Sequence, residues 1–113
     1  MAPCDYAYRQ LIEEALANRS VVGYIVWKRR ADEWLRENVD GHNQASINEV
    51  LYQHVIGGGE VDQVRERREW HRDEHAFHFD FRILIDGRRL YVETVVLEGS
   101  TGPSLTVVNI HDQ

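Results

Sequence analysis

Ionisable side chains alternate with large apolar ones between residues 77 and 85 of this 113-residue chain. The apolar set is Phe77, Phe79, Phe81, Ile83 and Ile85. A two-residue period predicts a β-strand with one buried face. His78, Asp80 and Arg82 would then share the opposite face. Imidazole, carboxylate and guanidinium groups are those that exchange protons and stabilise negative charge in phosphodiester cleavage.

A second strand is predicted to add ionisable groups to that face. Asp86–Gly87 is a hairpin signal, and residues 89–97 return as the next strand. A two-residue turn pairs residues as follows: Ile85 with Arg88, Arg82 with Tyr91, Phe81 with Val92, Asp80 with Glu93, Phe79 with Thr94 and His78 with Val95. Carboxylates directly opposite each other repel. Arg82, Arg89 or a proton shared by the pair is therefore expected to neutralise Asp80 and Glu93.

This face is our candidate site for a metal-independent ribonuclease. The predicted catalytic residues are His78, Arg82 and Glu93, and the predicted substrate-binding residues are Arg65, Arg67 and Tyr91. Arg82 would stabilise charge on the phosphate, while His78 and Glu93 would act as acid and base. No metal and no cofactor are predicted. The alternative is a solvated sheet face with surface ion pairs and no chemistry.

The histidines offer a metal-binding hypothesis. His71, His75 and His78 lie close in the sequence, and His111 falls on the last predicted strand. Neutral imidazoles bind zinc, nickel or copper, and a carboxylate such as Glu93 would add a ligand. No motif places two of these histidines on one helix, so solvated histidines are the alternative.

The net charge and the composition bear on whether the protein binds nucleic acid and on where in the cell it is found. The net charge of −6 argues against a surface dominated by phosphate contacts. Residues 65–72 nevertheless hold four arginines around Trp70, a combination that grips and stacks single-stranded nucleic acid. Interleaved acids favour a solvated strand end instead. The only cysteine is Cys4, and no secretory signal or membrane-spanning run is visible, so we expect a soluble cytoplasmic protein.

The periodicity predicts a single α+β domain over residues 1–113. Helices are expected from Asp5 to about Asn18–Ser20, from about Ser20 or Tyr24 to Asn38, and from a Ser46–Glu49 capping box to Gly57. Strands are expected over residues 61–67, 77–85, 89–97 and 105–110. The predicted fold is two to three N-terminal helices followed by a four-stranded antiparallel β-meander.

Three segments carry a family resemblance: VLYQHVIGGGEVDQV, AFHFDFRILIDGRRLYVETVV and LTVVNIH. Together, from Ile47 to Ile110, they resemble the small RelE/BrnT/MqsR-type toxin superfamily, especially its DUF4258-like branch. The resemblance implies a RelE-like fold with helices on one sheet face, RNA cleavage without a metal, and an antitoxin partner. The alternative function is a non-enzymatic module, or an inactive relative, that docks a protein partner.

Overall fold

The computed structural model describes residues 2–68 and 75–113 of an α+β chain. Its elements follow in the order β1 (Ala2–Pro3), α1 (Tyr6–Ala17), β2 (Ile25–Trp27), α2 (Arg29–Asn38), α3 (Gln44–Ile56), β3 (Val61–Arg65), β4 (Phe77–Ile85), β5 (Arg88–Gly99) and β6 (Gly102–Asp112). Within these residues, no helix is long and apolar enough to cross a membrane.

The described strands form one mixed sheet in the order β1-β3-β4-β5-β6-β2. Strands β3 to β6 make the predicted antiparallel meander. The prediction of four strands is wrong, because β1 pairs antiparallel with β3 at one edge and β2 pairs parallel with β6 at the other. The prediction that all helices precede the sheet is also wrong, since β1 precedes α1 and β2 separates α1 from α2.

The single helix predicted up to Asn38 is wrong over its first turns. Ile25–Trp27 instead pairs with Leu105–Val107. The Tyr24 carbonyl accepts from the Leu105 N–H at 2.8 Å, so β6 satisfies backbone groups that a helix would have satisfied internally. β-branched side chains favour this strand. The helix begins only at Arg29.

The third helix begins earlier than the predicted Ser46–Glu49 box. Asn43 is the N-cap: its Oδ1 accepts from the Ser46 N–H at 2.8 Å, and Ser46 Oγ accepts from the Asn43 N–H at 3.0 Å. The reciprocal capping that was predicted therefore exists with different partners. The predicted end at Gly57 is confirmed.

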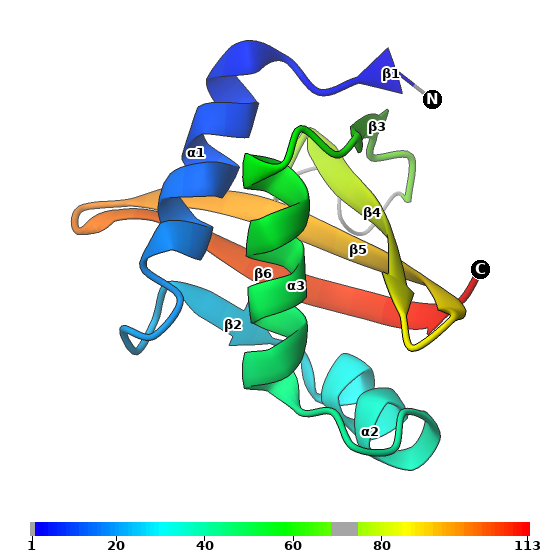
Figure 1. Cartoon of the computed structure of the whole chain (residues 1–113). Helices are drawn as coiled ribbons and strands as arrows, with labels where there is room; N and C mark the ends of the chain where they lie inside the picture. Colours follow the sequence, from blue (N-terminus) through cyan, green and yellow to red (C-terminus); the bar gives the residue numbers. More distant parts are fainter. Residues whose placement is uncertain (1, 69–74) are drawn as a thin grey trace.

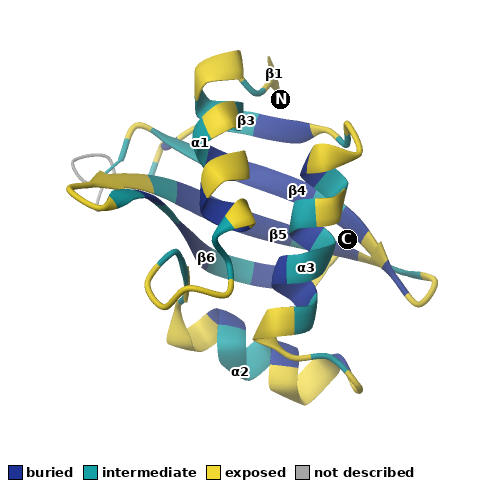
Figure 2. Cartoon of the chain, turned by 60° about the vertical axis from the view of Figure 1, so that its left-hand side comes forward, coloured by how far each residue is buried: buried dark blue, intermediate teal, exposed yellow. Residues whose placement is uncertain are grey.

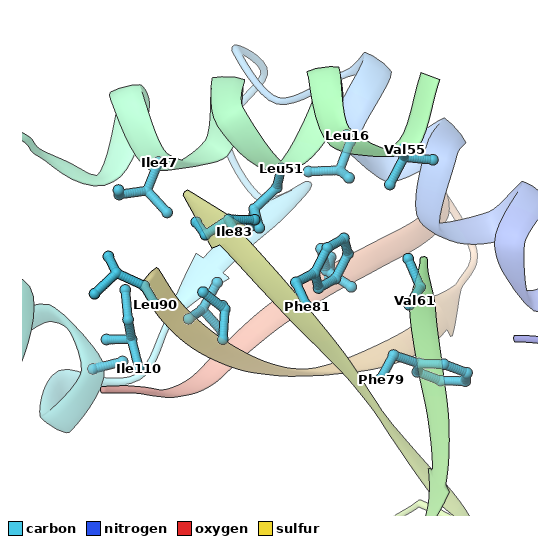
Figure 3. Close-up of a cluster of buried hydrophobic side chains, with 14 of the residues drawn as sticks. Leu16, Ile47, Leu51, Val55, Val61, Phe79, Phe81, Ile83, Leu90 and Ile110 are labelled. Atoms are coloured by element: carbon cyan, nitrogen blue, oxygen red, sulfur yellow. The ribbon is translucent and has the colours of Figure 1, made fainter. Parts of the chain in front are cut away.

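Helices α1 and α3 lie side by side on one face of the sheet (Figure 1). Figure 3 shows the contact between them and the strands, with Leu51 of α3 above Phe81 and Ile83 of β4. The central strands β4 and β5 carry much of the buried surface (Figure 2). Each fully buried Phe or Leu contributes about 1.5–3 kcal/mol. The inward orientation predicted for the phenylalanines is confirmed for Phe79 and Phe81, with Phe77 half-buried.

The β4–β5 register matches the two-residue turn. Asp86 and Gly87 both have positive φ, at 50° and 81°, as a type I′ hairpin requires. Ile85 pairs with Arg88, and Asp80 pairs with Glu93. The register therefore sends His78, Asp80, Arg82, Tyr91 and Glu93 to the face opposite α1 and α3.

Candidate functional site

Four carboxylates lie on or beside the sheet face opposite α1 and α3, which we call the polar face. They belong to Asp62 on β3, Glu66 just after it, Asp80 on β4 and Glu93 on β5, and are 6%, 3%, 1% and 8% exposed. Three of them form one row, because Asp62 pairs with Asp80 and Asp80 pairs with Glu93. Such buried charges require partners.

Asp80 connects a histidine to a tyrosine. Its Oδ1 lies 2.8 Å from His78 Nδ1, and its Oδ2 accepts a hydrogen bond from the Tyr91 hydroxyl. The bond to Asp80 raises the pKa of His78 above its ordinary value of 6.5, against the opposing effect of burial. Burial, then Asp80, raises the pKa of Tyr91, so its hydroxyl stays a donor. With Nδ1 bonded to Asp80, Nε2 is the nitrogen left for proton transfer.

Arg68 joins two of the other carboxylates. Its Nε and Nη2 donate to Glu66 at 2.9 and 2.8 Å, and Nη2 also donates to Glu93. His75 Nε2 lies 3.1 Å from the same Glu66. The pairing with Arg68 holds the pKa of Glu66 far below its usual range. Arg68 therefore neutralises Glu93, the role that the sequence suggested for Arg82 or Arg89.

Arg82 lies on the other side of Asp80 along β4. Its guanidinium is 2.5 Å from Asp62 and 3.9 Å from Glu60, and its side chain is one-third exposed. Across the hairpin it pairs with Tyr91, whose ring stacks on His111 at 5.0 Å between centroids. The polar face thus has a guanidinium paired with acids on each side of its central His78–Asp80 pair.

The described residues do not place all six predicted site residues together. His78, Arg82, Glu93 and Tyr91 share the polar face. Arg65 lies on the other face, where its guanidinium is 5.2 Å from the Phe77 ring centroid. Arg67 is exposed and forms no hydrogen bond or ion pair with another described residue.

The described histidines of the metal-binding hypothesis contact different partners. His75 pairs with Glu66, His78 pairs with Asp80, and His111 stacks on Tyr91. His71, Trp70 and Arg72 lie outside the described residues. Across residues 2–68 and 75–113, no group of three or more histidine, cysteine or acidic side chains has a geometry that would hold a metal ion.

Sequence reasoning missed three members of the cluster. Asp62 could have been found from the sequence, because alternation from the buried Val61 puts Asp62 on the polar face. Glu66 and Arg68 follow the strand, where no periodicity applies, so only the folded chain shows that they meet Glu93.

A comparison with known protein families, characterised proteins and solved structures finds no match to this chain. The chemistry is therefore argued from the geometry. Among the described residues, the polar face brings four carboxylates, two guanidiniums and the imidazoles of His75 and His78 together. An imidazole hydrogen-bonded to a carboxylate, as His78 is to Asp80, is a group used in general acid–base catalysis.

Proposed function

We propose that this protein is a RelE-like, metal-independent ribonuclease whose site is the polar face. The observation that supports it most is the His78–Asp80 hydrogen bond, which orients an imidazole with a raised pKa on the polar face. A histidine fixed in this way is suited to proton transfer near neutral pH. The order of elements that resembles RelE-type toxins supports the same class of reaction.

The proposed reaction attacks phosphorus with the ribose 2′-hydroxyl. Glu93, which accepts a hydrogen bond from Arg68, takes the 2′-hydroxyl proton as its carboxylate, and the new 2′-O–P bond forms as the P–O5′ bond breaks. His78, protonated at Nε2, gives its proton to the leaving 5′-oxygen. Arg82 stabilises the negative charge on the phosphate. The products are a 2′,3′-cyclic phosphate and a free 5′-hydroxyl.

Cleavage of end-labelled single-stranded RNA tests this proposal. His78→Gln is expected to lower the rate about 10²–10⁴-fold, the usual contribution of a general acid or base. Arg82→Ala and Glu93→Gln should also lower it. Leu84→Ala is the control, because Leu84 lies on the same strand, is 63% exposed and has no proposed role. Absence of cleavage by the wild type, or equal cleavage by wild type, Arg82→Ala and His78→Gln, excludes the ribonuclease.

The second candidate is a protein-docking module of the same fold. It is favoured by an exposed apolar group near the β2 edge, where Val22 is 100% and Leu97 47% exposed beside one shallow pocket. Contiguous apolar surface marks protein interaction sites. Titration with RNA separates the two functions, since salt-sensitive binding counts against the docking module.

A further inference from the structure

A small cavity continues the polar face towards the β5–β6 hairpin. It measures about 120 Å³ and is lined by the charged or ionisable Lys28, Arg68 and His75 and by a floor of Val95, Leu97, Thr106 and Val108. Val95 follows Glu93 by two residues on β5, so it points to the same face. Thr106 is opposite Val95 on β6. The cavity therefore lies beside the groups proposed to cleave the phosphodiester bond.

The Thr106 hydroxyl is the polar group in this apolar floor. Thr106 is only 4% exposed, and its hydroxyl has no hydrogen-bond partner in the described part of the chain. The hydroxyl is not one of the fully buried polar atoms among the described residues, so it is accessible from the cavity that Thr106 lines. This hydroxyl is available as both donor and acceptor to a molecule that enters the cavity.

Two cations lie at the rim of the cavity. Lys28 is exposed and forms no ion pair with any described residue. Arg68 is one-third exposed above its two carboxylates. In a chain with a net charge of −6, an ammonium that no described residue neutralises, beside an apolar cavity, favours a ligand that carries a negative charge next to an uncharged ring.

We propose that this cavity binds one nucleobase of the RNA substrate. The valine and leucine side chains contact the face of the base, the Thr106 hydroxyl bonds to its edge, and Lys28 contacts the adjoining phosphate. Planar bases that unstack from single strands are held in this way, by apolar contact and a few polar groups. The proposal rests on the ribonuclease function, since it assigns the substrate's position on the same face.

The test uses a probe that binds without being cleaved. A fluorescein-labelled single-stranded DNA pentamer lacks the 2′-hydroxyl, so its anisotropy reports binding alone. Thr106→Val removes the hydroxyl at constant shape and is expected to raise Kd about 2- to 10-fold. Thr106→Ser, which keeps the hydroxyl, should stay closer to the wild type than Thr106→Val. An abasic pentamer should bind more weakly than the pentamer with bases.

The phosphate contact has its own matched pair of variants. Lys28→Gln should weaken binding and reduce the slope of log Kd against log salt concentration by about one ion. Arg30→Gln removes a nearby exposed cation that does not line the cavity, so it should leave that slope unchanged. Equal slopes for wild type and Lys28→Gln overturn the contact.

The two proposals fail in different ways. If RNA is not cleaved but DNA binding still depends on Thr106, the base site stands and the ribonuclease falls. If RNA is cleaved and Thr106→Val changes neither Kd nor KM, the ribonuclease stands and the base site is wrong. Equal affinity for the abasic and base-carrying pentamers, or no binding at low salt, also overturns the base site.

Discussion

Replacing Arg68 with glutamine removes the guanidinium that joins Glu66 and Glu93. The Glu66 and Glu93 side chains are only 1% and 11% exposed, so little water is available to replace the guanidinium. Glu66 keeps His75 as a neighbour, whereas Glu93 loses the only salt bridge that the described residues give it. The variant therefore isolates the cost of burying charge on the polar face.

The expected loss of stability is about 3 kcal/mol at pH 7. Breaking one side of a buried ion pair costs about 3–5 kcal/mol, and the one-third exposure of Arg68 places this case at the lower end. For an m-value of about 1.5 kcal/mol/M, the urea midpoint falls by about 2 M. Such a loss is a large part of the roughly 5–15 kcal/mol that stabilises an ordinary domain.

The pH dependence separates buried charge from lost packing. Arg68 depresses the pKa of Glu66, so the wild type keeps this stabilisation above the ordinary value of 4.5 and loses it as pH falls towards the folded pKa. In Arg68→Gln the Glu66 carboxylate gains a proton more readily, so the difference between the proteins should shrink at pH 4. Arg67→Gln, at an exposed neighbour, is the control. A difference below 1 kcal/mol at pH 7, or one that is equal at both pH values, refutes the reasoning.

Three further predictions concern single contacts. Asp80→Asn should lower the pKa of His78, measured by NMR titration. A raised histidine pKa stabilises the fold below pH 6.5, and this stabilisation is lost as the pH rises through the folded pKa. The urea midpoint of the variant should therefore depend less on pH than that of the wild type. Gly59→Ala should cost about 1–3 kcal/mol in urea unfolding, because its Cβ would lie 2.5 Å from the His54 ring. Thr94→Val should cost about 1 kcal/mol by the same assay, since it loses a buried 2.7 Å hydrogen bond to a carbonyl of β4; an unchanged midpoint contradicts it.

The parts of the fold that follow from local pattern were predictable. The alternation in Phe77–Ile85 and the Asp86–Gly87 turn fix the β4–β5 register, because a slip by one residue would expose Phe79 and Phe81. The pairing of β2 with β6 depends on residues about 80 positions apart, so no local sequence pattern predicts it. A short strand beside good helix formers is therefore hard to distinguish from a helix.

The β5–β6 register is a second feature that simple alternation does not predict. The pairs Glu93–Asn109 and Thr94–Val107 leave Val108 as the extra residue of a bulge. The bulge lets Val107 and Ile110, three residues apart, both lie in the core at 0% exposure. The sequence itself indicates the bulge, because the apolar residues from Leu105 to Ile110 do not alternate strictly with polar ones. Strict alternation from Leu105 and Val107 puts Val108 on the same face as Thr106, where it lines the cavity, but it would put Ile110 outside the core.

Stability alone is a poor explanation for the polar face. Ion pairs in buried positions usually cost more in desolvation than they return, and apolar residues of similar volume stabilise as well or better. This face nevertheless has Asp62, Asp80 and Glu93 in one row across three strands, with cations drawn from β4 and from the chain after β3. A chain built only for stability would continue apolar residues across this face, as it does at Val95 and Val108. The abrupt change from charged row to apolar cavity along β5 is therefore a feature that stability alone does not explain, and it is the boundary at which the proposed base site would begin.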